Sequence, residues 1–302
     1  MNMDVMRRLA IYQAERFPLG RTSLLVAVFS AASVTASSGL AGRGLPPITT
    51  YLAAFVATLC FFFQLRVLDE IKDADDDLEF RPERPIPRGL VSLRLIIGLG
   101  LATVPLTIAA CALVDPRLIV LLVLVWLWMA LMTAEFFVPE VLRSSPTLYT
   151  VSHMLVMPLI DLVVTGFEWM PHRDSPSGLW VFLLMSFSNG CVLEIGRKLW
   201  APANEREGVD TYSALMGPAN AGLLWIGCMT TSLVLLLGVG LYTGGPVTTA
   251  AIGIAAAFWA YRRAQAYRHM PTAGTQTAMD ATAGIWVIAC YVAAALGGIV
   301  GL

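Results

Sequence analysis

Long apolar stretches separated by short polar segments dominate this chain of 302 residues. A helix needs roughly 20 mostly apolar residues to cross the hydrocarbon core of a bilayer. Nine stretches fit that requirement, at residues 22–42, 47–66, 92–113, 117–137, 148–166, 177–199, 219–241, 247–264 and 281–301. The pattern predicts an all-α, multi-pass membrane protein built as a bundle of nine transmembrane helices.

The N-terminal segment differs from these stretches because charged and apolar residues alternate in it. Arg7, Arg8, Glu15 and Arg16 lie among apolar residues, without the compact apolar core and small-residue cleavage site of a signal peptide. We expect residues 1–21 to form an amphipathic segment at the membrane interface. A single transmembrane domain over residues 22–302 would follow it.

Composition agrees with a membrane protein, since 57% of the residues are hydrophobic and only 14% are charged. Soluble domains have about 25% charged residues. The formal net charge of −1 gives no basic surface for a nucleic acid partner. All five cysteines stand singly in apolar runs, so zinc sites and disulfides are not expected.

The distribution of basic residues predicts the orientation in the membrane. If the predicted spans alternate in direction, 17 of the 20 Lys and Arg residues fall on the side of the N-terminus. Cytoplasmic loops carry the excess of basic residues in membrane proteins. We therefore expect an integral protein of a bacterial cytoplasmic membrane, in contact with membrane lipid and with its N-terminus in the cytoplasm.

The densest cluster of charge follows the second predicted span, at residues 66–94, and holds 14 of the chain's 41 formal charges. Asp69, Asp73 and Asp77 are spaced four residues apart, which places them on one face of a continuing helix, with Glu70 beside them. Mg²⁺ prefers such carboxylate ligands and leaves positions open for substrate phosphates. The basic residues suited to phosphate oxygens are Lys72, Arg81, Arg84 and Arg88. The alternative is a solvated acidic loop with internal salt bridges.

A second cluster follows the sixth predicted span. Glu194 lies late in an apolar run, where an ionisable residue indicates a functional site. Glu205 and Asp210 come after it and complete a second candidate set of metal-binding carboxylates. The nearby candidates for substrate binding are Asn189, Arg197 and Lys198. The alternative is a helix end anchored at the interface by Arg197, Lys198 and Trp200.

Three more polar residues are expected at the same level of the membrane. Glu135 lies near the end of the fourth predicted span, and Tyr149 and His153 near the start of the fifth. As candidate catalytic residues, Tyr149 or His153 would orient an acceptor and Glu135 would take up a proton. For His153, a hydrogen-bonded position between helices is the alternative.

These features together resemble the UbiA superfamily of intramembrane prenyltransferases. The first motif of that family reads N-D-x-x-D-x-x-x-D and is followed by a basic stretch with R-P. The corresponding residues of this chain are Asp69-Glu70-x-x-Asp73-x-x-x-Asp77 and then Arg84-Pro85. Asp73 and Asp77 match directly, whereas Asp69 stands where the family has Asn and Glu70 where it has Asp.

The second motif departs further from the family pattern. The family shows aspartates spaced by about four residues and then a Gly-led segment, which residues 208–217 resemble. Glu194 stands for the first aspartate and Glu205 for a later one, but the middle carboxylate falls on Ala201-Pro202-Ala203. This departure leaves open whether a second metal ion binds.

The resemblance implies a fold in which cytoplasmic loops cap a central cavity. It also implies Mg²⁺-dependent transfer of a prenyl group from a prenyl diphosphate to a lipophilic or aromatic acceptor within the membrane. The alternative on the same scaffold is a terpene cyclase, which needs no acceptor. A cation transporter or a non-catalytic membrane partner ranks below both, because the carboxylates crowd at one membrane face instead of following a path through the bilayer.

Overall fold

The computed structural model describes residues 3–301, and every regular element in them is a helix. Seven segments are long and apolar enough to cross a membrane. They are α2 (Leu19–Leu40), α3 (Ile48–Lys72), α5 (Leu93–Val114), the α8–α9 segment (Pro146–Trp169), α10 (Leu179–Arg197), α12 (Pro218–Thr243) and α14 (Ala273–Gly301).

Two of the nine predicted spans are helical but fall outside that group. The first, α6 (Leu118–Thr133), is strongly apolar but has only 16 residues. The second, α13 (Pro246–His269), is long enough, but its mean hydropathy is low because its last turns contain Arg262, Arg263 and Arg268. The prediction of helices is therefore confirmed, and the count of candidate spans becomes seven.

The fifth predicted span is two helices, α8 (Pro146–Met154) and α9 (Val156–Trp169), joined at Leu155. Pro158 has no amide hydrogen to donate to the carbonyl of Met154, so the regular hydrogen-bond ladder is interrupted here. The break leaves α8 near the charged loops and α9 in the interior of the bundle.

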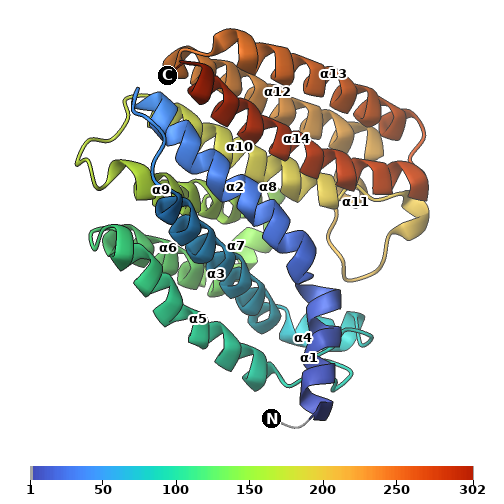
Figure 1. The fold of residues 1–302 in the computed structure, drawn as a ribbon. Coiled ribbons are helices and arrows are strands. Elements are labelled where there is room, and N and C mark those ends of the chain that lie inside the picture. The colour runs from blue at the N-terminus through green and yellow to red at the C-terminus, as the bar shows by residue number, and fades with distance from the viewer. Residues whose placement is uncertain (1–2, 302) are drawn as a thin grey trace.

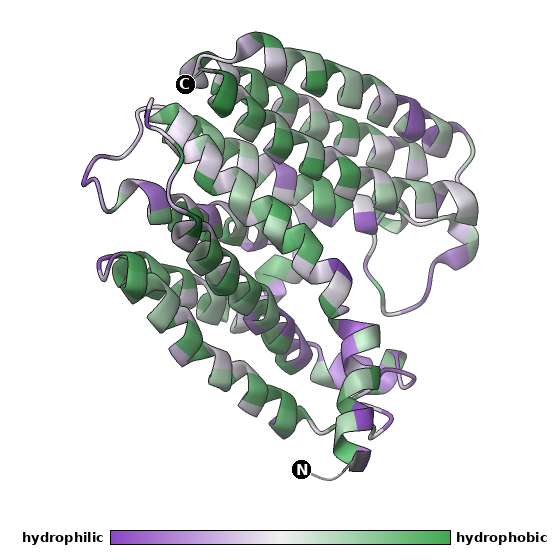
Figure 2. Cartoon of the chain, in the orientation of Figure 1, coloured by the Kyte–Doolittle hydropathy of each residue, from purple (hydrophilic) through white to green (hydrophobic). Residues whose placement is uncertain are grey.

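The helices form one bundle (Figure 1), and many of its polar segments gather at one end (Figure 2). In it, α2 lies between α14 and α3, and α10, α12, α13 and α14 pack against one another. Hydrophilic residues concentrate around α1 (Met3–Arg16), α4 (Ala74–Phe80) and the loop before α11 (Tyr212–Met216), as Figure 2 shows. We call this the charged end of the bundle.

Small residues allow the closest helix contact, between α2 and α14. A Cβ atom on Gly39 would lie 2.3 Å from Cα of Gly298, so only glycine permits this approach. Membrane helices associate through such small residues because lipid offers no hydrophobic driving force between them. Trp225 and Trp286 are fully buried in the neighbouring core.

Ion pairs close the opposite end of the bundle. Arg43 Nε donates to the buried Oε1 of Glu168 at 2.8 Å, joining the loop after α2 to the end of α9. Between α5 and α6, hydrogen bonds from Arg117 hold the pKa of Asp115 below its ordinary value. These contacts hold the loops at the end of the bundle opposite the charged end. We therefore look for the functional site at the charged end.

Candidate active site

A cavity of about 400 Å³ opens at the charged end, and we call it the polar cavity. It is enclosed by the ends of α3, α8 and α10, by α4, and by residues 208–211. Its charged and aromatic polar lining residues are Arg16, Arg66, Asp69, Lys72, Asp73, Asp76, Arg81, Arg84, Tyr149, His153, Arg197, Lys198 and Asp210.

Carboxylates form one wall of the polar cavity. Asp69 lies in the last turn of α3, Asp73 joins α3 to α4, and Asp76 lies in the first turn of α4. Because the helix is interrupted at Asp73, the third carboxylate of this wall comes from Asp76. The expected face through Asp69, Asp73 and Asp77 assumed a helix without that break.

Asp77 lies behind the wall instead of lining the cavity. It is 2% exposed and accepts hydrogen bonds from Arg81 Nη1 at 3.0 Å and from Arg84 Nη1 at 2.6 Å. Both arginines line the polar cavity. The structure therefore places Asp77 as the residue that holds two cavity-lining guanidinium groups.

The acidic wall has the chemistry of a divalent cation site. Burial and the neighbouring carboxylates of Asp69 and Asp77 raise the pKa of Asp73. Among the described ion pairs, none includes Asp73 or Asp76. No three His, Cys, Asp or Glu side chains of the described chain gather closely enough to hold a metal alone. Mg²⁺ commonly takes one or two carboxylates and completes its shell with water and phosphate oxygens, so the wall fits that ion.

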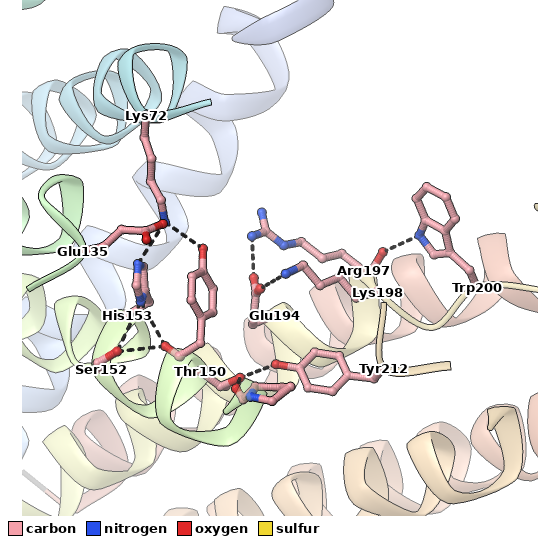
Figure 3. A network of polar contacts seen from close by, with 12 residues as sticks. Lys72, Glu135, Thr150, Ser152, His153, Glu194, Arg197, Lys198, Trp200 and Tyr212 are labelled. Carbon is pink, nitrogen blue, oxygen red and sulfur yellow. Dashed lines mark hydrogen bonds and ion pairs between the residues drawn. The ribbon is translucent and has the colours of Figure 1, made fainter. Parts of the chain in front are cut away.

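Cations form the facing wall at the end of α10. Arg197 and Lys198 line the polar cavity and both contact Glu194, which is 3% exposed. Lys198 Nζ lies 2.9 Å from Glu194 Oε1, and Arg197 Nη2 contacts Oε2 (Figure 3). Two cations thus share one carboxylate, and this wall presents a net positive charge.

Lys72 links the two walls to a group of polar side chains on α8. Its Nζ atom lies 3.2 Å from Glu135 Oε1 and donates to the Tyr149 hydroxyl at 3.1 Å (Figure 3). The ring of His153 stacks on Tyr149 at 3.9 Å between centroids. His153 Nδ1 lies 2.9 Å from the carbonyl oxygen of Tyr149 and Nε2 lies 3.3 Å from Lys72 Nζ, so Nδ1 donates and Nε2 accepts.

Glu135 is presented by an unusual turn. Glu135, Phe136 and Phe137 have positive φ angles of 46°, 52° and 60°, in the left-handed region that L-residues rarely adopt. The ring of Phe136 packs against Trp128 and His153, which holds the turn in place. The buried Oε2 atom of Glu135 has no hydrogen-bond partner within the described residues.

A side cavity of about 200 Å³ adjoins this turn. Glu135, Tyr149 and Tyr212 line it together with apolar residues of α7 (Pro139–Ser144) and α11. It shares Lys72 and other residues with the polar cavity. A second molecule bound there would therefore lie beside the charged group bound in the polar cavity.

An apolar cavity of about 400 Å³ continues from the polar cavity into the bundle. The two cavities share Arg16, Leu65, Arg66 and Asp69. Below these residues the lining is apolar and comes mainly from α2, α3 and α14. The combined shape suits an amphiphile with an anionic head and an apolar tail.

Comparison with known proteins agrees with this arrangement. Residues 27–288 match the UbiA prenyltransferase family. The chain belongs to this family. As a UbiA-family prenyltransferase it is an enzyme and an integral membrane protein. No curated protein matches its sequence.

Two solved structures share the UbiA fold over almost the whole chain. A digeranylgeranylglyceryl phosphate synthase has a TM-score of 0.66 and 13% identity, covering 97% of this chain and 99% of the other. A UbiA homologue from Aeropyrum pernix K1 has a TM-score of 0.66 and 16% identity, covering 91% and 97%. At these identities the likeness shows the fold.

In this UbiA protein, Glu70 lies outside the cavity, although the sequence suggested it as a metal ligand. It is buried against α1, where it accepts a hydrogen bond from Arg16 Nε at 2.7 Å and one from the Tyr12 hydroxyl at 3.4 Å. Arg16 itself lines both cavities. Sequence reasoning missed Arg16 because it counted only as one of the basic residues that set the orientation.

Three other predicted residues also lie away from the polar cavity. Asn189 is buried between α10 and α12, where it accepts from Ser232 Oγ at 2.6 Å. Glu205 accepts from the hydroxyls of Thr211 and Ser213, which ties the loop before α11 together. Arg88 donates to Glu15 and to the carbonyl oxygen of Glu83. Within the second cluster, Arg197, Lys198 and Asp210 line the polar cavity. Glu194, predicted as a metal ligand, does not line it, because it is buried behind the two cations that it pairs with.

Proposed function

We propose that this enzyme transfers a prenyl group from a prenyl diphosphate to a lipophilic, aromatic acceptor in a Mg²⁺-dependent reaction. The observation that carries the proposal is the joining of the polar and apolar cavities at Arg16, Leu65, Arg66 and Asp69. A prenyl diphosphate has the same division into a strongly anionic head and an apolar tail. Its reacting bond would lie where the two cavities meet.

The diphosphate is bound between the two walls of the polar cavity. Asp69, Asp73 and Asp76 would hold Mg²⁺, which neutralises phosphate oxygens and stabilises the leaving diphosphate. Arg197 and Lys198 face the remaining oxygens from α10, and Arg16, Arg81 and Arg84 reach them from α1 and from the segment around α4. Charge that develops on the leaving group meets cations already fixed in place by Glu194 and Asp77.

The acceptor binds in the side cavity, beside Tyr149 and Tyr212. The bond between the first prenyl carbon and the diphosphate oxygen breaks, and that carbon forms a bond to an acceptor carbon. The acceptor carbon then loses its proton to Oε2 of Glu135, while Lys72 holds Oε1. The stacked Tyr149 and His153 rings orient the acceptor and exclude water from the allylic cation.

We further propose that all nine apolar segments cross the membrane, with the charged end in the cytoplasm. At about 1.5 Å per residue, α6 is roughly 24 Å long, and the turn after it adds to that length. The positive-inside rule supports this orientation, because 17 of the 20 Lys and Arg residues belong to the charged-end segments. Residues 1–21 would then lie at the cytoplasmic interface of a bacterial membrane, before a single domain over residues 22–302.

The test uses the purified full chain in detergent or nanodiscs with prenyl diphosphates of several lengths. Diphosphate release is measured with Mg²⁺, with EDTA, and after Mg²⁺ is restored. Asp73→Asn is compared with Asp75→Asn, because Asp75 is an exposed carboxylate two residues away that does not line the cavity. We expect EDTA and Asp73→Asn to abolish release, and Asp75→Asn to leave it unchanged.

Products identify the acceptor class. Prenylation of a hydroxylated aromatic acid supports the proposal. Transfer only to a glyceryl phosphate lipid would contradict the aromatic acceptor and would indicate an acceptor like that in the name of the digeranylgeranylglyceryl phosphate synthase. A cyclic product formed without any acceptor would assign a cyclase. Equal diphosphate release by wild type and Asp73→Asn would refute the metal site.

A further inference from the structure

Three helices each present one continuous face to the apolar cavity. The residues of these faces are Thr22, Leu25, Val26 and Phe29 of α2; Phe62, Leu65, Arg66 and Asp69 of α3; and Gly284, Val287, Ile288 and Tyr291 of α14. Val28 of α2 also lines the cavity. Each set follows the spacing i, i+3, i+4, i+7 of one helix face. In each set the member farthest along its helix from the charged end is aromatic: Phe29, Phe62 or Tyr291.

Phe29 contacts the other two aromatic residues, at the end of the lining that is farthest from the charged end. The ring centroids of Phe29 and Phe62 lie 5.9 Å apart, and those of Phe29 and Tyr291 lie 4.7 Å apart. Behind them, Phe182 packs edge-on against Tyr291 at 5.8 Å. We call Phe29, Phe62 and Tyr291 the aromatic floor.

Hydrogen bonds deep in the bundle hold Tyr291 in position. Its hydroxyl donates to Asp161 Oδ2 at 2.5 Å and lies 3.2 Å from Ser186 Oγ, and Ser33 Oγ donates to Asp161 Oδ1 at 2.7 Å. All four residues are at most 1% exposed, and they come from α14, α9, α10 and α2. An ionisable residue within a membrane is costly, and the proposed reaction does not use Asp161. Its contacts instead fix a tyrosine whose ring lines the tail cavity.

We propose that the aromatic floor limits the length of the prenyl tail, with Tyr291 as a specificity-determining residue and Asp161 as the residue that positions it. The inference rests on the proposed function, because it takes the apolar cavity as the site of the prenyl tail. The anionic head lies at Asp69, and the tail extends along the three faces until it meets the floor.

The depth of the cavity sets the preferred length. Seven residues of α3 separate Phe62 from Asp69, which corresponds to about 10 Å along the helix. An extended amino-acid residue has three backbone bonds and spans about 3.5 Å. An isoprene unit has four bonds along its chain, so by the same scale it extends about 4.5 Å. The cavity therefore holds about two units, and we expect a preference for geranyl diphosphate over its three- and four-unit homologues.

The experiment compares wild type, Tyr291→Ala and the control Phe258→Ala, which shortens an exposed aromatic side chain that does not line the cavity. With Mg²⁺ present, kcat/KM for diphosphate release is measured for two-, three- and four-unit diphosphates. Tyr291→Ala opens space for about one more unit. We expect it to raise the ratio of three-unit to two-unit kcat/KM by at least about tenfold, and the control to leave the ratio unchanged.

Milder variants keep the test decisive if Tyr291→Ala does not fold. Tyr291→Phe keeps the ring and removes its hydrogen bonds, and Asp161→Asn weakens the same contacts. We expect each variant to raise the ratio of three-unit to two-unit kcat/KM, by a smaller factor than Tyr291→Ala. The double variant should raise this ratio no further than either single variant, because the two residues act through one contact. The Kd values of non-hydrolysable prenyl diphosphate analogues should change in parallel, and a role in stability alone would not alter their ratio.

The two hypotheses fail in different ways. If wild type releases no diphosphate from any prenyl diphosphate with Mg²⁺, the proposed function is wrong. If wild type is active but prefers the four-unit substrate, or if no folded variant changes the length ratio, the aromatic floor does not set the length and this inference is overturned.

Discussion

The substitution Asp77→Asn tests whether Asp77 has a structural role or binds the metal ion. The Asp77 side chain is 3% exposed and accepts three hydrogen bonds, one from Arg81 and two from Arg84. A hydrogen bond to a charged group contributes about 1.5–3 kcal/mol, and asparagine keeps only one acceptor oxygen. Two guanidinium groups would then face a neutral amide, so we expect the free energy of unfolding to fall by about 2–4 kcal/mol.

That loss is measurable by thermal unfolding in detergent. At about 2–4 °C per kcal/mol, the Tm should fall by roughly 4–16 °C. Binding of Mn²⁺ as a spectroscopic substitute for Mg²⁺ is measured on the same samples. Asp77→Asn should retain most of its Mn²⁺ affinity, whereas Asp73→Asn should lose that affinity with little change in Tm. If Asp77→Asn instead keeps its Tm and loses Mn²⁺, Asp77 is a metal ligand and our assignment of Asp77 is wrong.

Four further substitutions test other parts of the site. Glu135→Gln should lower kcat by about 10²–10⁴-fold with unchanged affinity for prenyl diphosphate, and an unaltered kcat would exclude Glu135 as the proton acceptor. Arg16→Gln should raise KM for prenyl diphosphate about tenfold, and Glu70→Gln, which releases Arg16, should raise it less; identical KM values would remove Arg16 from the site. Gly208→Ala should speed proteolysis of the loop before α11, because Gly208 has φ +73° and the new Cβ would lie 2.6 Å from Phe80 Cδ1. An unchanged cleavage rate would show that the loop adapts.

The helices were predictable from the sequence because the hydrophobic period and length of each segment are local properties. The position of Asp76 was not, since it depends on a change of helix direction at Asp73 that carries no local signal such as proline or glycine. A helix without the break would place Asp77 at the cavity, so the spacing alone identified the cluster but not its third member.

Contacts between distant segments account for most of what the sequence did not reveal. Asp161 and Tyr291 are 130 residues apart, and Arg16 and Glu70 are 54 apart. No periodicity within one helix indicates which face of another helix it meets. The sequence therefore predicted the charged residues of the cavity walls better than it predicted the residues that hold them, such as Asp77, or the floor of the apolar cavity.

The left-handed turn at Glu135, Phe136 and Phe137 has a consequence for evolution of the enzyme. Left-handed backbone costs an L-residue roughly 1–2 kcal/mol, and glycine avoids that cost. Glycine at Phe136 would therefore relax the backbone, but it would also remove the ring that packs on Trp128 and His153. We expect a stability–activity trade-off at this position, in which selection for a more thermostable protein favours a substitution that misplaces Glu135.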